Sequence, residues 1–348
     1  MRIYSIDLFK LIFTILVVFA HMDINYPGAD VAVDFFFVMS GFFMAKKFYS
    51  RKDDESYSQF DYTADRLKKL YPQYIFSLLV MFCYILGRDV VRIAAGSHLA
   101  GGIGDLAARV YEIIPSVFMV QNIGFFGSGI NGPAWYLSVM VVAGCFIYAF
   151  LRHNHRMYSE TVFPIVFILL ETYLYGGKDP FGIVGPFYIA MLRGVAAMLQ
   201  GVLIYKFFCS SWGTKLRSGK VLFNIVGIFS IIALFACGRF NNSQLIMFVF
   251  AVVYMNTSES WINKAVKGRI FGRVGDLAYA VYLNHALVIM VLEDLYAKLG
   301  IAVEHIKFGW IAVAASVVYS IFTVWLLDRL KPFCKNKILP VLKAKKIV

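Results

Sequence analysis

Three ionisable residues near the N-terminus have the spacing of a site inside a membrane helix. Lys10 and His21 enclose an apolar stretch of Leu, Ile, Phe and Val, and Asp7 lies three residues before Lys10. At 100° per residue, eleven residues return to nearly the same helix face, roughly 16 Å further along the axis. Ionisable groups at membrane depth are unfavourable and usually belong to a working site or its support. The alternative is that Asp7 and Lys10 lie at an interface and that His21 simply ends the span.

The composition is that of a membrane protein. Of the 348 residues, 60% are hydrophobic and 16% are charged, whereas soluble domains average about 45–50% apolar and 25% charged residues. Apolar runs of membrane-spanning length recur along the chain. We therefore expect an all-α, polytopic helical bundle forming one integral membrane domain over residues 1–348. No small-residue cleavage site follows the first apolar run, so we expect an uncleaved anchor.

Hydropathy predicts ten transmembrane helices, and the charges predict their orientation. The predicted spans are 5–22, 30–48, 71–88, 133–151, 161–176, 185–207, 221–238, 243–256, 276–293 and 308–328. The eighth is short, and segment 105–130 is ambiguous between an interfacial and a re-entrant helix. Most of the 34 Lys and Arg residues fall in alternate loops and in the basic tail 329–348. This bias predicts a multi-pass protein of the cell's inner (plasma) membrane with both termini in the cytoplasm.

Several partner classes are disfavoured by the same pattern. The net charge of +13 could suggest nucleic acid, but charges in alternate loops are typical of topology signals. The five cysteines are scattered without metal-ligand spacing, and the sequence contains no phosphate-cradling glycine loop. We therefore expect no metal site and no permanently bound cofactor. The oligomeric state is left open.

The second predicted span contains polar and small residues among its aromatic side chains. Asp34, Phe37 and Gly41 share one helix face, and Ser40 precedes Gly41. Small residues allow a close approach by another helix backbone or by a thin acyl chain. Both interpretations stay open here.

Basic and aromatic residues precede the third and fourth spans. Arg66 and Lys69 lie just before Tyr71, either as topology charges or as ligands for a phosphorylated donor at the inner face. Trp135 and Tyr136 have the amphipathic character of residues that anchor a helix at an interface.

Polar groups also lie in the later spans. Tyr282 and His285 are three residues apart, so hydroxyl and imidazole could share a hydrogen bond. Glu171 and Arg193 are further charges at membrane depth, which either pair or line a polar cavity.

Taken in order, these segments resemble the acyltransferase-3 family of membrane-integral O-acyltransferases. The similar segments are Ile6–Lys10, His21, Val33–Phe42, Arg66–Pro72, Trp135–Ser138 and Tyr279–His285. The resemblance covers almost the whole chain and includes the ten-helix count. It implies transfer of an acyl group, commonly acetyl from acetyl-coenzyme A as co-substrate, to a hydroxyl of a cell-surface carbohydrate or glycolipid precursor.

On this basis we assign His21 as the general base, with Lys10 and Asp7 supporting it. The expected donor-binding or substrate-binding residues are Asp34, Phe37, Ser40, Arg66, Lys69, Tyr71, Trp135, Tyr136, Ser138, Arg193, Tyr282 and His285. Ser40, Ser138 and Tyr282 are also candidates for an acyl-enzyme relay, because the donor is cytosolic whereas His21 is predicted in the outer half of the membrane.

The chain departs from the family pattern at three positions. Lys10 and Lys69 stand where arginine is usual, and Met140 stands where many members have glutamate. Lysine keeps the charge but lacks the planar fork of arginine. The rival function is a transporter or flippase for a glycan or lipid precursor, which would predict inverted repeats and broken helices. A non-catalytic scaffold would leave the polar positions unexplained.

Overall fold

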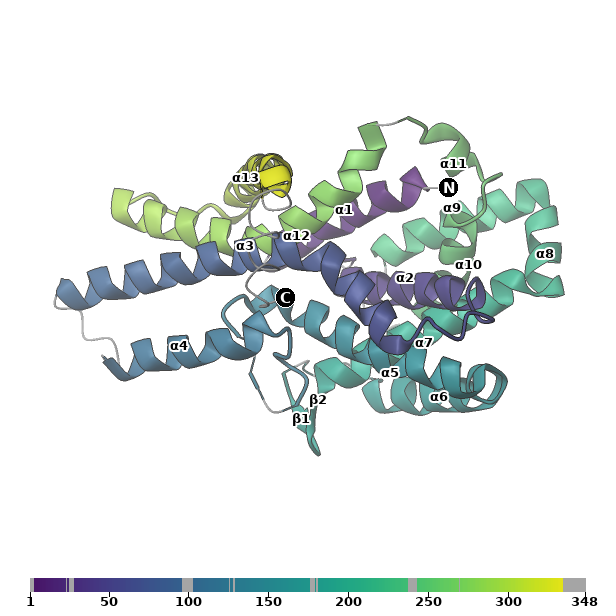
Figure 1. Cartoon of the computed structure of the whole chain (residues 1–348). Coiled ribbons are helices and arrows are strands. Elements are labelled where there is room, and N and C mark those ends of the chain that lie inside the picture. The colour runs from purple at the N-terminus through teal and green to yellow at the C-terminus, as the bar shows by residue number, and fades with distance from the viewer. Residues whose placement is uncertain are drawn as a thin grey trace.

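The computed structural model of the chain is almost entirely helical (Figure 1). It describes residues 3–22, 24, 28–95, 103–124, 126–127, 129–175, 179, 181–236, 243–268 and 270–333. The main helices are α1 (Tyr4–Ala20), α2 (Ala29–Tyr49), α3 (Gln59–Ala94), α4 (Ile103–Val117), α5 (Trp135–Met157), α6 (Phe163–Leu174), α7 (Ile189–Cys209), α9 (Lys220–Ala236), α10 (Ser243–Met255), α12 (Ile270–Leu299) and α13 (His305–Phe333). The shorter elements are the 3-10 turn η1 (Gly132–Ala134), the π-helical turn η2 (Tyr158–Val162), α8 (Ser211–Ser218), α11 (Trp261–Ala265) and the antiparallel strands β1 (Ile183–Val184) and β2 (Phe187–Tyr188). Most of the predicted basic tail, residues 334–348, lies outside the described residues.

Helices α2 and α7 pack extensively against each other, and glycines make their close approach possible. A Cβ atom at Gly41 would lie 2.0 Å from the carbonyl oxygen of Met198, and one at Gly201 would lie 2.1 Å from that of Val38. Both clashes involve backbone atoms of the facing helix. The sequence left open whether Gly41 admits a backbone or an acyl chain, and the structure places the α7 backbone there.

Helix α1 connects this pair to the C-terminal part of the chain. It packs along α12 on one side and against α2 on the other. Its buried residues include Phe13, whose ring stacks on Phe35 of α2 with centroids 4.5 Å apart. Residues near the end of α1 are thereby held between α2 and α12.

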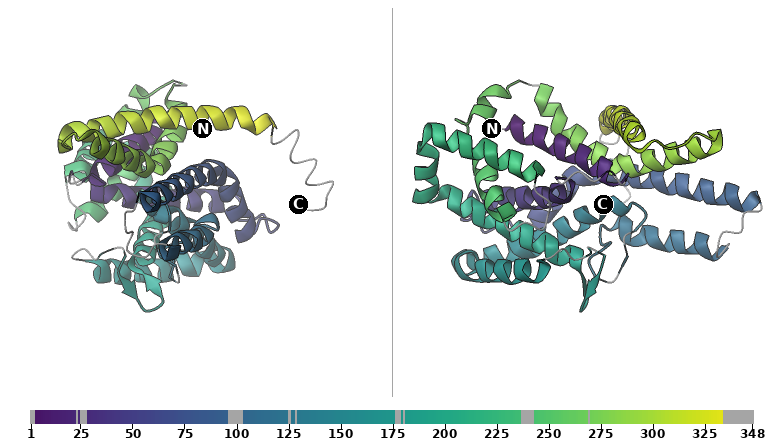
Figure 2. Two further views of the ribbon diagram at one scale, coloured as in Figure 1. Left: turned by 90° about the vertical axis from the view of Figure 1, so that its left-hand side faces the viewer. Right: turned by 180° about the vertical axis from the view of Figure 1, so that it is seen from behind.

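Helix α3 begins at a side-chain cap and extends well beyond the packed centre. The Ser58 hydroxyl accepts a hydrogen bond from the Asp61 amide, and the Asp61 carboxylate accepts one from the Ser58 amide. This reciprocal cap satisfies two amides that a helix start would otherwise leave free. At its far end α3 runs beside α4 (Figure 1 and Figure 2). There Arg109 Nε of α4 lies 3.9 Å from Asp89 Oδ2 of α3.

Five helical segments of the described residues are long and apolar enough to cross a membrane. They are α3, the run Gly132–Leu174, α7, Phe271–Leu299 and His305–Lys331. The pair α8 and α9, bent by 101°, would be a sixth if it formed one span. Large apolar side chains are exposed on these helices, including Ile168 and Ile321, as expected of surfaces that face lipid. The chain is therefore a helical membrane protein.

The predicted count of ten spans is not confirmed. Helix α1 has 17 residues and α10 has 13, whereas a perpendicular crossing needs about 20. The predicted spans 133–151 and 161–176 correspond to α5 and α6, which follow each other across a kink at Asn154 and both pack against α7. The ambiguous segment 105–130 contains most of α4, and its described residues after Val117 form turns, bends and irregular chain.

Candidate active site

His21 lies at the C-terminal end of α1, where its side chain is exposed. Its Nδ1 is 2.8 Å from the carbonyl oxygen of Val17, one turn earlier in the helix. A carbonyl oxygen only accepts hydrogen bonds, so Nδ1 carries the proton. The lone pair of the neutral ring is then on Nε2. The end of the helix therefore prepares His21 to accept a proton at Nε2.

His285 of α12 packs directly against His21. The two ring centroids are 4.9 Å apart, with the planes inclined by 65°. The His285 side chain is completely buried, and its Nδ1 lies 2.7 Å from the carbonyl oxygen of Tyr282. The contact arises because α1 packs along α12. It shows that the His21 ring faces the bundle.

The predicted hydrogen bond between the Tyr282 hydroxyl and His285 is not formed. His285 uses the backbone carbonyl of Tyr282, whereas the Tyr282 hydroxyl donates to the carbonyl of Pro133 at 2.6 Å. On a helix the long Tyr side chain carries its hydroxyl well away from its own backbone. The carbonyl three residues before His285 is the nearer acceptor for the imidazole.

Aromatic rings continue from the two histidines into α2 and α5. The Tyr282 ring lies 5.8 Å from His285 and 5.0 Å from Tyr136, between centroids. Phe37 in turn lies 5.4 Å from Tyr136 and 6.0 Å from Trp135. Aromatic residues predicted from four separate segments therefore lie in one continuous cluster.

Lys10 and Asp7 form the predicted pair, but away from His21. Lys10 Nζ is 3.8 Å from Asp7 Oδ1 and 6.0 Å from the centre of the Phe43 ring. Asp7 is buried, while the Lys10 side chain is 35% exposed. Eleven residues of helix separate Lys10 from His21, a rise of roughly 16 Å. Lys10 can therefore influence chemistry at His21 only through a long substrate or at a distance.

Asp34 and Arg193 bind each other across α2 and α7. Arg193 Nε donates to Asp34 Oδ1 at 2.6 Å, and its terminal nitrogen donates to Oδ2 at 3.0 Å. Both side chains are buried. The sequence left open whether Arg193 pairs with Glu171 or lines a polar cavity; the structure shows it bound to Asp34 instead. A bidentate pair in a water-poor interior fixes the two helices relative to each other.

Arg66 connects three helices from the beginning of α3. Its guanidinium donates to Ser40 Oγ of α2 at 2.5 Å and to Met140 Sδ of α5 at 2.8 Å. It also donates to the hydroxyl of Tyr62, one turn earlier in α3, at 3.0 Å. Its Nε is buried and has no hydrogen-bond partner within the described ranges. The predicted contact residues Arg66 and Ser40 are thus brought together.

Residues 3–329 match a family model described as an acyltransferase domain. The chain belongs to the acyltransferase-3 family. No curated protein and no solved structure gives a significant match. With its apolar helices, the protein is a membrane acyltransferase.

One departure of this acyltransferase from the family pattern has a structural consequence. The Arg66 guanidinium points at the Met140 sulfur, the position where many members have a glutamate. A thioether is a weak hydrogen-bond acceptor, so Arg66 lacks a counter-ion at this contact. The Ser40 hydroxyl, which also accepts from Arg66, is its stronger acceptor.

The remaining predicted residues of the acyltransferase are dispersed. The Tyr71 hydroxyl donates to the carbonyl of Val117 at 2.9 Å, and Lys69 is exposed. Ser138 is fully buried, and its hydroxyl has no hydrogen-bond partner among the residues that the structure describes. The described residues contain no group of three or more His, Cys, Asp or Glu side chains that could hold a metal ion.

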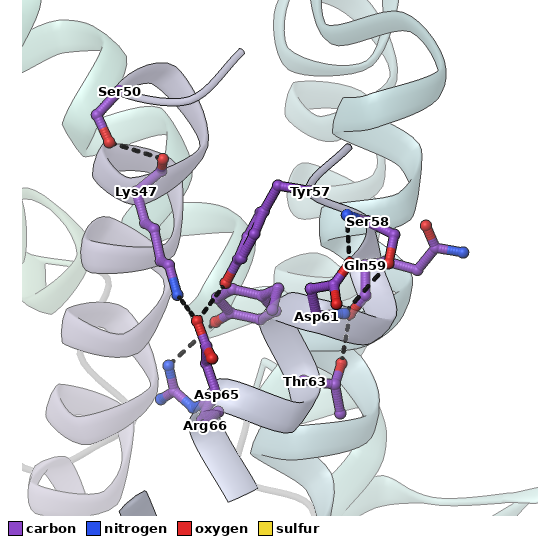
Figure 3. A network of polar contacts seen from close by, with 10 residues as sticks. Lys47, Ser50, Tyr57, Ser58, Gln59, Asp61, Thr63, Asp65 and Arg66 are labelled. Carbon is purple, nitrogen blue, oxygen red and sulfur yellow. Dashed lines mark hydrogen bonds and ion pairs between the residues drawn. The ribbon is translucent and has the colours of Figure 1, made fainter. Parts of the chain in front are cut away.

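A polar cluster between α2 and α3 was not predicted. The Asp65 carboxylate accepts from Lys47 Nζ and from the Tyr57 hydroxyl, both at 2.8 Å (Figure 3). Burial, and next the hydrogen bond to Asp65, raises the pKa of the Tyr57 hydroxyl. Arg51 lies over the Tyr57 ring, 4.5 Å from its centre. Basic residues that the sequence indicates only as topology signals therefore also fix the start of α3.

Proposed function

We propose that this acyltransferase moves an acyl group, in our proposal the acetyl group, from acyl-coenzyme A to a hydroxyl of a cell-surface glycan or glycolipid precursor. The observation that carries the proposal is the contact of His21 Nδ1 with the Val17 carbonyl oxygen, from which the tautomer of the ring is inferred. Its Nδ1 is bound to the Val17 carbonyl, which leaves Nε2 as a proton acceptor on an exposed ring. Membership of the family supports acyl transfer as the reaction, and in our proposal His21 is its general base.

The reaction needs a base because a sugar hydroxyl is a weak nucleophile. In our proposal His21 Nε2 takes the hydroxyl proton while the oxygen attacks the thioester carbonyl. The new C–O bond forms, the C–S bond breaks, and the coenzyme A thiolate leaves. The proton on His21 then passes to that thiolate, which restores the neutral ring. An imidazole titrates near neutral pH and can perform both steps.

The donor is proposed to approach along the inner side of the bundle. Lys69 is exposed about three turns into α3 and is suited to coenzyme A phosphates. Arg66 already binds Ser40, Tyr62 and Met140, which favours a supporting role for it. Lys10, with Asp7 as its partner, would steady the donor electrostatically.

We favour direct transfer over an acyl-enzyme relay. The Ser40 hydroxyl accepts from Arg66, and the Tyr282 hydroxyl donates to Pro133. Ser138 is fully buried. Within the described part of the chain, none of these three hydroxyls is hydrogen bonded to a side chain that could act as its general base. His21 is exposed and can take the proton of the acceptor hydroxyl directly.

We place the protein in the cell's inner membrane with both termini in the cytoplasm. Support comes from the basic residues of the 46–69 region, including Lys47 and Arg51, which lie on the same side as the chain termini in the predicted topology. In this orientation the donor enters from the cytoplasm, the acceptor enters from the outer half of the membrane, and the two meet at His21.

The proposal is tested by incubating purified protein with acetyl-coenzyme A labelled in the acetyl group and a membrane glycolipid extract. Label in the glycan, linked as an ester and absent without protein, is the expected result. Label retained on the protein would indicate an acyl-enzyme relay instead. Glycolipid translocation with no acetyl transfer would contradict the proposal and favour a transporter.

A further inference from the structure

Helix α8 lies at the edge of the bundle and carries an exposed tryptophan. It begins at Ser211, directly after α7 ends at Cys209, and is bent by 101° from α9 (Figure 1). Because α7 is long and apolar enough to cross a membrane, we expect a helix that turns away at its end to lie at the membrane surface. The Trp212 side chain of α8 is 71% exposed. Tryptophan is enriched at membrane interfaces because its ring is both apolar and able to donate a hydrogen bond.

Close contacts hold α8 against the end of α7. A Cβ atom at Gly213 would lie 2.1 Å from the carbonyl oxygen of Phe207, so a larger residue would push the two helices apart. The Ser210 hydroxyl accepts a hydrogen bond from the Gly213 amide at 3.1 Å. The Arg217 guanidinium lies 4.0 Å from the centre of the Phe208 ring. The side chains of α8 therefore have fixed positions relative to α7.

An apolar groove of about 370 Å³ opens between α7, α8 and α10. It is lined by Phe207, Trp212, Lys215, Leu216 and Phe250. Clefts of about 300–1,000 Å³ are typical of sites that hold small molecules. All the lining residues except the lysine are apolar, so the groove is suited to a hydrocarbon chain.

Lys215 adds a positive charge to this groove. Its Nζ lies 5.9 Å from the centre of the Trp212 ring. The side chain is exposed and forms no ion pair with any residue that the structure describes. The sequence has no Asp or Glu between Asp179 and Glu259, a stretch that supplies all of α7, α8, α9 and α10. An anionic ligand at Lys215 would therefore meet no repulsion from a carboxylate of these helices.

We propose that this groove binds an anionic phospholipid of the cytoplasmic leaflet, with an acyl chain between Trp212 and Phe250 and the phosphate on Lys215. In the predicted topology α8 lies on the cytoplasmic side, where anionic lipids give the membrane surface a negative potential. The stem of a lysine can follow an apolar wall while its ammonium group reaches a headgroup. The lipid site goes beyond acyl transfer and does not depend on the proposed role of His21.

The test measures lipid binding to the purified full-length protein in detergent micelles by native mass spectrometry. Phosphatidylglycerol is the anionic probe, and phosphatidylcholine with the same acyl chains is the zwitterionic control. We expect one phosphatidylglycerol to bind about fivefold more tightly than phosphatidylcholine, because one lysine near a membrane surface favours anionic lipid by about that factor. Equal affinities for the two lipids would overturn the proposal.

A substitution of Lys215 tests the contact with the headgroup. Lys215→Gln should weaken phosphatidylglycerol binding about fivefold and leave phosphatidylcholine binding unchanged. The position is exposed, so the variant should fold normally. Lys267→Gln is the matched control, because it removes the same charge from an exposed lysine of the loop before α12. Equal effects of the two variants would indicate a general effect of net charge and would overturn the proposal.

A substitution of Trp212 tests the contact with the acyl chain. Trp212→Ala should weaken the binding of both lipids about threefold, because the chain loses its van der Waals contacts with the indole ring. Trp261→Ala is the matched control, since Trp261 is 49% exposed at the beginning of α11 and outside the groove. If both variants bound lipid as the wild type does, the groove would not hold the chain.

Coenzyme A is the competing anionic occupant of a site on the cytoplasmic side. Adding it should leave phosphatidylglycerol bound, because the proposed donor-binding residue Lys69 lies on α3 and not beside the groove. Displacement of the lipid by coenzyme A in the wild type, but not in Lys215→Gln, would assign the groove to the donor and overturn the proposal.

Discussion

Replacing Gly41 with alanine tests the close packing of α2 against α7. The added Cβ would lie 2.0 Å from the carbonyl oxygen of Met198 and 2.9 Å from its Cα, where van der Waals contact requires about 3.5 Å. The obstructing atoms belong to the α7 backbone, so no side chain can rotate away. Helices α2 and α7 must separate, which disturbs the aromatic packing between them.

The expected loss in unfolding free energy is about 2–3 kcal/mol. Overpacking a well-packed interior costs about 1–3 kcal/mol, and rigid backbone places this site at the upper end. Gly87→Ala is the matched control, because a Cβ there meets nothing within 4 Å in helix α3. That variant should be neutral or gain up to about 1 kcal/mol from helix propensity.

The assay is unfolding in mixed detergent micelles followed by tryptophan fluorescence, with circular dichroism as a second probe. If Gly41→Ala were as stable as Gly87→Ala, the close packing of α2 on α7 would be refuted. Gly201→Ala, whose Cβ would lie 2.1 Å from the Val38 carbonyl oxygen, should reproduce the loss.

Two other substitutions test the charged pairs. Lys10→Arg keeps the cation beside Asp7 and should retain most acetyl transfer, whereas Lys10→Ala should lose about tenfold; equal rates would make Lys10 a topology charge. Asp34→Asn removes the carboxylate that binds the buried Arg193 guanidinium and should lower the unfolding free energy by about 3–5 kcal/mol. Unaltered stability in the micelle assay would show that this ion pair is not structural.

Contacts set by local spacing could be predicted from the sequence. Asp7 and Lys10 are three residues apart on one helix and do form an ion pair. Spacing was insufficient for Tyr282 and His285, because a backbone carbonyl competes with the hydroxyl for the imidazole. Helical periodicity fixes which side chains share a face, but not which polar atoms bind.

Contacts between distant segments depend on how helices pack, and hydropathy does not encode that. The pair of Asp34 with Arg193 follows from α2 lying along α7. The pair of His21 with His285 follows from α1 lying along α12. The sequence pointed to these residues separately, Arg193 as a charge at membrane depth and the others within the segments that resemble the family, and the structure shows which of them meet.

The most direct test of the account compares acetyl transfer by His21→Ala and His305→Ala in the same membranes. His21 has its Nε2 left as an acceptor beside His285, whereas His305 is exposed at the beginning of α13. We predict a loss of about 10²–10⁴-fold for His21→Ala with normal membrane insertion, and no loss for His305→Ala. Transfer by His21→Ala at the wild-type rate would contradict the assignment of His21 as the base.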